Sequence, residues 1–172
     1  MRPLTWLLLP STVIAVLTFH YEGRISAQTN GSFAATTIAK GRFGEIDVAP
    51  PNLKSQKHES SDWHSWQKTK GSSDLYVQSN VWTPGASTGW HTHPGHSLII
   101  VTAGTVTEYE GDDPNCKPTV HTEGMGFVDR GGEHVHIIRN EGAVEARTIA
   151  VQLIPADAMH RIDAADPRNC QF

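Results

Sequence analysis

Three histidines in two separate segments have the spacing of a metal site. His91 and His93 stand two positions apart in GWHTHPGH, so on an extended strand both imidazoles would project onto one face. His136 lies in HVHIIRN, a later segment whose pattern also predicts a strand. Three neutral imidazoles suit Fe, Mn, Zn, Ni or Cu and leave coordination positions open for water or a substrate. We therefore predict that one divalent transition-metal ion, any of these five, is held by His91, His93 and His136.

Two more histidines lie beside this set and leave alternatives open. His96 follows His93 closely, and His134 precedes His136 by two positions and so shares its strand face. Either could be a further ligand, or a weak acid/base candidate that titrates near neutral pH. The competing interpretation is a group of hydrogen-bonded structural histidines. No such spacing marks four other histidines, which we expect to be solvated: His58, His64, His121 and His160.

The composition indicates one globular domain of ordinary size. The chain has 172 residues, 38% of them hydrophobic and 19% charged, enough for one core but hardly for two. The formal net charge is -4, and no basic stripe is present. Nucleic-acid binders usually carry a basic surplus, so we expect no nucleic-acid partner. A metal site with open positions instead predicts a small-molecule ligand or substrate.

The pattern from about residue 74 onward predicts many short strands. Leu75, Val77 and Val81 alternate with Gln78, Asn80 and Trp82, the period of two that marks a strand, and Pro84-Gly85 ends it. Further strands bounded by Gly, Asp or Pro are expected at 98–102, 105–109, 118–122, 127–128, 135–139 and 147–154. We expect at most one short turn or helix, at 156–165. The predicted fold class is all-β, an antiparallel sandwich or barrel.

The N-terminal residues 1–27 have the pattern of a signal peptide. Arg2 precedes an apolar stretch over 4–19, and Ser26-Ala27 ends a polar segment. This stretch is shorter than the roughly 20 residues that span a bilayer, so we expect no stable membrane anchor, with an uncleaved signal anchor as the alternative. Cleavage near Ala27 predicts a secreted or periplasmic protein. Residues 28–70 read as a partly flexible arm with one short strand near 46–48.

The two cysteines fit an exported protein. Cys116 lies in the turn GDDPNC and Cys170 lies near the C-terminus. In an oxidising compartment an even pair in polar loops predicts a disulfide, and two free thiols are the alternative. The bridge would tie the tail, residues 157–172, to that turn.

The histidine segments resemble the two motifs of the cupin superfamily. The first motif runs Gly, five residues, His-x-His, three or four residues, Glu, six residues, Gly, and the span 85–104 follows its spacing. The second runs Gly, five residues, Pro-x-Gly, two residues, His, three residues, Asn, and 124–140 follows it loosely. The resemblance implies an antiparallel cupin barrel (a double-stranded β-helix or jelly roll) over 71–156.

The sequence departs from these motifs at three points. Ser97 stands at the position of the glutamate, or Leu98 if the gap is counted as four residues. Arg130 replaces the proline, and one extra residue separates Gly132 from the second-motif histidine. The implied ligand set is therefore three histidines without a carboxylate, or one that recruits His96 or His134.

The resemblance implies two functions of different classes. Three-histidine cupins suggest a metal-dependent small-molecule dioxygenase, although a fold alone does not fix chemistry. The alternative is a non-catalytic module that binds a small ligand or metal. Cupins also pair through edge strands, which implies a homodimer.

Overall fold

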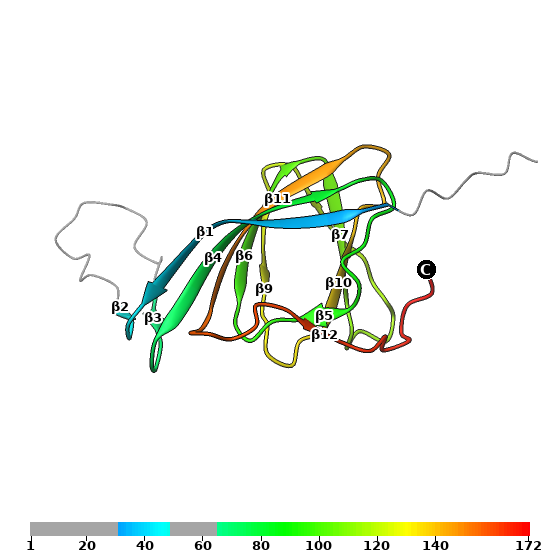
Figure 1. Cartoon of the computed structure of the whole chain (residues 1–172). Helices are drawn as coiled ribbons and strands as arrows, with labels where there is room; N and C mark the ends of the chain where they lie inside the picture. Colours follow the sequence, from blue (N-terminus) through cyan, green and yellow to red (C-terminus); the bar gives the residue numbers. More distant parts are fainter. Residues whose placement is uncertain (1–30, 49–64) are drawn as a thin grey trace, which may run out of the picture.

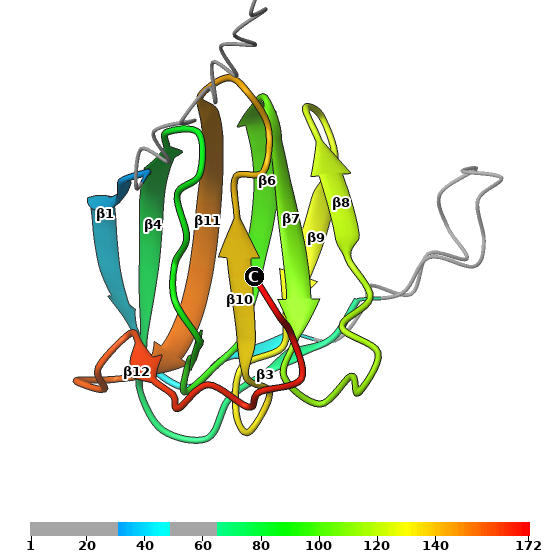
Figure 2. The ribbon, with the colours of Figure 1, turned by 90° about the vertical axis from the view of Figure 1, so that its right-hand side faces the viewer.

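Two five-stranded antiparallel sheets make up most of the protein. The computed structural model describes residues 31–48 and 65–172, so the predicted signal peptide, His58 and His64 lie outside the described residues. One sheet has the order β1 (Phe33–Phe43), β4 (Ser73–Trp82), β11 (Ala146–Pro155), β6 (Ser97–Ala103) and β9 (Gly126–Asp129). The other has the order β12 (Ile162–Asp163), β5 (His91–Thr92), β10 (His136–Arg139), β7 (Thr105–Glu110) and β8 (Thr119–Thr122). The sheets face each other across the interior (Figures 1 and 2).

A small ribbon stands beside this body. It consists of β2 (Asp47–Val48) and β3 (Gln67–Lys68), which pair antiparallel. In Figure 1 this ribbon lies at the left, next to the ends of β1 and β4. The predicted strand near 46–48 corresponds to β2. Over 31–48 and 65–172, no helix is long and apolar enough to cross a membrane.

The all-β prediction is confirmed, and the longest strand was missed. β1 lies in the segment read as an arm, yet it pairs with β4 along the strand from Phe33–Trp82 to Phe43–Ser73, with an irregularity at Thr37. Most of its side chains are exposed, so they carry no hydrophobic alternation. Backbone hydrogen bonds hold this edge strand, and they leave no signature in side-chain pattern. The span 156–165 contains β12 and no helix.

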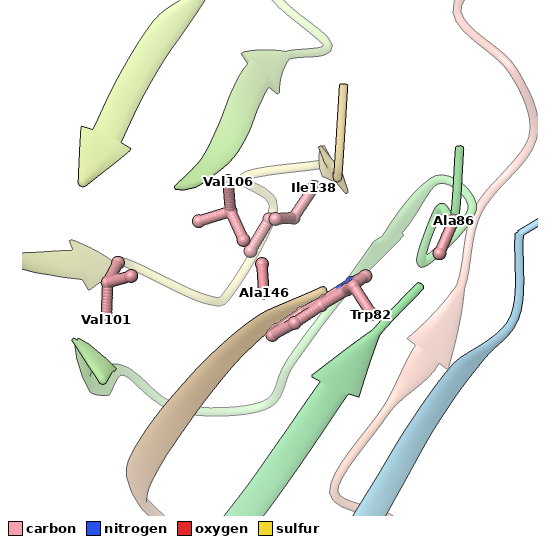
Figure 3. Packing of buried hydrophobic residues seen from close by; sticks show 6 residues of the cluster. All are labelled: Trp82, Ala86, Val101, Val106, Ile138 and Ala146. Carbon is pink, nitrogen blue, oxygen red and sulfur yellow. The ribbon is translucent and has the colours of Figure 1, made fainter. Parts of the chain in front are cut away.

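The apolar core fills one end of the space between the sheets. Trp82, which is 1% exposed, packs with five smaller side chains shown in Figure 3: Ala86, Val101, Val106, Ile138 and Ala146. Asn140, the last residue of the second motif, closes the same end. Its side-chain amide donates to the carbonyls of Trp82 and Val144 over 3.0 and 2.8 Å. The motif asparagine is thus buried and connects β4 to the turn before β11 by hydrogen bonds.

The opposite end of the interior is polar. Gln152, Ser97 and Asp129 are register partners across β11, β6 and β9, and each is at most 2% exposed. Next to them, Gln78 and Asn80 of β4 also face inward and are buried. Buried polar side chains cost free energy unless they are paired, so this end of the barrel is where a site is expected.

The predicted disulfide is present. Cys116 and Cys170 are bonded across 54 residues, which fixes the C-terminal tail to the loop between β7 and β8. Both half-cystines pack against a second apolar cluster formed by Trp90, Tyr109 and Ile137. Asn169 adds two hydrogen bonds from its amide to the carbonyls of Glu110 and Asp113.

Candidate metal centre

The three predicted ligand histidines come together at the polar end of the barrel. His91 and His136 are direct register partners across β5 and β10, and His93 follows β5 immediately. Their potential ligand atoms all lie within 4.8 Å of one another. His91 and His136 are 4% and 1% exposed, so the cluster is buried apart from the partly exposed His93 ring.

Backbone carbonyls orient two of the rings. His91 Nδ1 lies 2.9 Å from the carbonyl oxygen of Gly89, and His93 Nδ1 contacts the carbonyl oxygen of His160. A carbonyl only accepts hydrogen bonds, so each Nδ1 carries the proton. His91 Nε2 then presents its lone pair, the arrangement that fixes the tautomer of metal-binding histidines.

Burial disfavours the charged forms of His91 and His136. It lowers the pKa of His91 to about 2, helped by the neighbouring His136. It also lowers the pKa of His136 to about 4, although Asp129 opposes that shift. His136 Nδ1 is buried without a hydrogen-bond partner. Two buried imidazoles that favour the neutral form, with the His93 ring beside them, are a donor set that suits a divalent transition metal, so the residues fit such an ion.

A carboxylate that the sequence did not reveal lies against the cluster. Asp129 is 2% exposed, and its Oδ2 is 3.3 Å from His93 Nε2 while its Oδ1 is 3.4 Å from His136 Nδ1. Ser97 Oγ donates to Oδ2 over 3.3 Å, and the Gly131 N–H donates to Oδ1 over 2.9 Å. In the sequence Asp129 stands before Arg130-Gly131-Gly132, where an aspartate is usual in a turn, so only strand pairing could have revealed it.

The other candidate histidines do not join the cluster. His134 Nδ1 lies 3.2 Å from Glu110 Oε2, in a separate group with Asp112. Neither His134 nor His96 is among the residues that line the adjoining cavity.

The expectation that His121 is solvated is wrong. Its side chain is buried, its Nε2 lies 3.0 Å from Glu108 Oε2, and its ring stacks on Phe127 with centroids 4.0 Å apart. Burial raises the pKa of Glu108 to about 7 and lowers the pKa of His121. The two buried groups therefore share one proton as a structural pair. His160 is exposed, as expected, and contributes its carbonyl rather than its ring.

A cavity of about 70 Å³ adjoins the histidines and Asp129. The walls from β4 and β11 include four polar side chains, those of Gln78, Asn80, Thr148 and Gln152. Trp82, Ile99 and Ile138 supply apolar contacts, and Arg161 also lines the cavity. Asn80 Oδ1 and Gln152 Oε1 are buried without a hydrogen-bond partner. The Gln152 amide nitrogen donates to the His160 carbonyl over 3.1 Å, which fixes the unpaired oxygen as an acceptor.

No protein-family model and no curated protein matches this sequence. Parts of solved structures do. A Klebsiella pneumoniae protein with a double-stranded β-helix domain is 21% identical, with 53% of this chain and 76% of that chain covered and a TM-score of 0.44. A cupin superfamily protein from Desulfitobacterium hafniense is 10% identical, with coverage of 69% and 81% and a TM-score of 0.41. An oxalate oxidase is 20% identical, with coverage of 48% and 46% and a TM-score of 0.39.

This chain spans about half the length of the larger matched chains, oxalate oxidase among them. Three features of the chain itself bear on the resemblance to cupins. Both motifs lie at the required separation, two antiparallel sheets enclose the site, and the motif histidines converge at one end of the barrel. In these features the chain resembles the cupin superfamily.

Proposed function

We propose that this protein is an exported metal-binding cupin in which His91, His93 and His136 hold one divalent transition-metal ion beside a small-molecule pocket. One observation carries the proposal: potential ligand atoms of three histidines from two separate segments converge within 4.8 Å beside a cavity.

The chemistry of the pocket limits the ligand. A bound metal of this type would polarise a substrate oxygen or bind O₂. A cavity of about 70 Å³ holds only a few water-sized groups, so the ligand is a small molecule. The unpaired oxygens of Asn80 and Gln152 need hydrogen-bond donors. Because the Arg161 side chain also lines the cavity, the pocket favours a small neutral or anionic hydroxyl-bearing compound over a cationic amine.

The enzymatic form of this proposal is a metal-dependent small-molecule dioxygenase. The alternative is a non-catalytic module that binds such a ligand or the metal itself. One observation favours the alternative: His96 and His134, the two acid/base candidates, are absent from the described lining of the cavity. Catalysis would then depend on the metal centre without help from either side chain.

Oxygen uptake separates the two forms. Wild-type protein, His91→Ala and the matched control His96→Ala are each equilibrated with Fe(II) or Mn(II), then mixed with small alcohols, diols, amines and phenols. The dioxygenase proposal predicts substrate-dependent oxygen consumption by the wild type and by His96→Ala, lost in His91→Ala. Ligand-induced thermal stabilisation without oxygen consumption would instead support the binding module.

The proposal includes export and self-association. Mass spectrometry of protein recovered from the export fraction should find a mature chain that begins near Gln28. Light scattering should give the mass of two chains for the homodimer. An intact leader in that fraction would contradict cleavage, and a single-chain mass would contradict the dimer.

A further inference from the structure

Asp129 occupies the space that the first motif assigns to another side chain. Ser97 stands at the glutamate position of that motif, and Asp129 is its register partner on the neighbouring strand. Register partners project to the same face of a sheet with their Cβ atoms about 5 Å apart. A carboxylate on either strand can therefore reach the same point inside the barrel.

The ion pairs of this carboxylate are with imidazoles, and the Arg161 side chain lines the same cavity without contacting the carboxylate. Among the described residues, no lysine or arginine forms an ion pair with Asp129; its charged-group contacts are the His93 and His136 imidazoles alone. Its remaining partners are two neutral donors, the Ser97 hydroxyl and the Gly131 N–H. A buried carboxylate without a lysine or arginine in contact carries a desolvation cost. A divalent ion between the imidazoles and Asp129 would compensate that cost.

The backbone holds the carboxylate against His93. Gly131 has a φ of 65°, and a Cβ atom there would lie 2.2 Å from the carbonyl oxygen of Gly95. The Gly132 N–H donates to the His93 carbonyl over 2.7 Å, and the Thr92 hydroxyl donates to the Gly132 carbonyl over 2.8 Å. Hydrogen bonds and close backbone packing thus hold the turn after Asp129 against β5 and the segment that follows it. These contacts keep Asp129 next to His93.

We propose that Asp129 is the fourth protein ligand of the metal centre, so that the carboxylate is supplied from β9 instead of β6. This inference rests on the three-histidine centre proposed above. His93 Nε2 faces the centre because its other nitrogen contacts a carbonyl, and Asp129 Oδ2 lies 3.3 Å from it. Two ligand atoms on adjacent positions of one ion lie about 3 Å apart when each is about 2.1 Å from the metal. One carboxylate also lowers the net charge of a divalent site from +2 to +1.

Metal affinity and the Co(II) absorption spectrum test this role without any assay of activity. Asp129→Asn keeps the shape of the side chain and removes its charge, and Asp47→Asn, an exposed site on β2, is the matched control. The relocation variant Ser97→Glu/Asp129→Ser moves the carboxylate to the register partner. Chelator competition measures Co(II) affinity for each protein, and thermal unfolding without metal confirms folding.

A ligand role predicts three results. Asp129→Asn weakens Co(II) binding by more than about 100-fold, beyond the range for loss of a side chain that only orients a ligand. The Co(II) spectrum changes in the same variant. The relocation variant recovers affinity to within about tenfold of the wild type.

Two outcomes would overturn the role of Asp129 while the histidine centre stands. One is unchanged Co(II) affinity in Asp129→Asn. The other is weakened binding with an unchanged spectrum and no recovery in the relocation variant, which would make Asp129 a positioning residue for His136. Failure of the proposed centre looks different, because wild-type protein would then bind no Co(II), and both proposals would fall together.

Discussion

Ser97 and Asp129 face each other across β6 and β9, and the serine hydroxyl donates to Asp129 Oδ2 over 3.3 Å. The residue at the motif's glutamate position therefore remains part of the site, as a hydrogen-bond donor to a carboxylate on the next strand. The barrel keeps an acidic side chain beside its histidines even though its first motif has none.

Removal of that hydroxyl should have a modest cost. We expect Ser97→Ala to lower the free energy of unfolding by about 1 kcal/mol, the usual net value of one hydrogen bond, and to leave metal bound. Urea unfolding and metal analysis check both parts. Ser79→Ala, on the outward face of β4, is the control and should change little. A loss of metal as complete as in a histidine variant would assign Ser97 a larger role than the structure gives it.

The apolar end of the barrel should be the main source of stability. Trp82→Ala removes the largest fully buried side chain and is expected to cost about 3–5 kcal/mol. Val144→Ala, at a site 66% exposed, should stay within about 0.5 kcal/mol of the wild type. Chemical denaturation of the two variants measures the difference. Similar losses in both would show that the cluster in Figure 3 is not the core that holds the sheets together.

Asp74 should make the protein sensitive to acid. It is fully buried and accepts hydrogen bonds from Arg42 and from the Asp157 N–H, and the Arg42 guanidinium holds the pKa of this carboxyl well below its ordinary value of 3.8. Stabilisation from a depressed carboxyl pKa is complete above the unfolded-state value and is lost as pH falls toward the folded-state value. The melting temperature of the wild type should therefore decrease as the pH is lowered below about 4.

Asp74→Asn isolates this contribution. The variant should be less stable than the wild type near neutral pH, and its melting temperature should depend less on pH below about pH 4. Asp47→Asn, whose partner Lys68 is on the surface, should reproduce the wild-type curve. Parallel acid profiles for Asp74→Asn and the wild type would exclude this ion pair as the source of acid sensitivity.

The disulfide should stabilise the fold without serving the metal site. Cys116→Ser/Cys170→Ser opens a loop of 54 residues, for which chain entropy predicts a loss of about 4 kcal/mol. Metal content should not change, because neither cysteine lines the cavity. Denaturation and metal analysis of the double variant measure both effects. Loss of metal from folded protein would show that the tail supports the centre.

The sequence predicts those parts of the molecule whose residue spacing or hydrophobic alternation is visible within one segment. His91, His93 and His136 were found because motif spacing fixes their faces, and most interior strands show alternation. β1 gave no such signal, since its side chains are exposed and only its backbone is paired. Asp129 and His121 depend on which strands are neighbours, and that information is absent from any single segment. The three histidines of the candidate site were thus predictable from the sequence, whereas the position of Asp129 beside them was not.

The most direct test is the metal stoichiometry of the folded protein. Wild type, His136→Ala and His96→Ala are dialysed against a divalent transition metal, freed of excess metal and analysed by elemental mass spectrometry, with circular dichroism to confirm folding. The three-histidine centre predicts about one ion per chain in the wild type and in His96→Ala, and a large loss in His136→Ala. Folded wild type with no bound metal, or with equal metal in all three proteins, would contradict it.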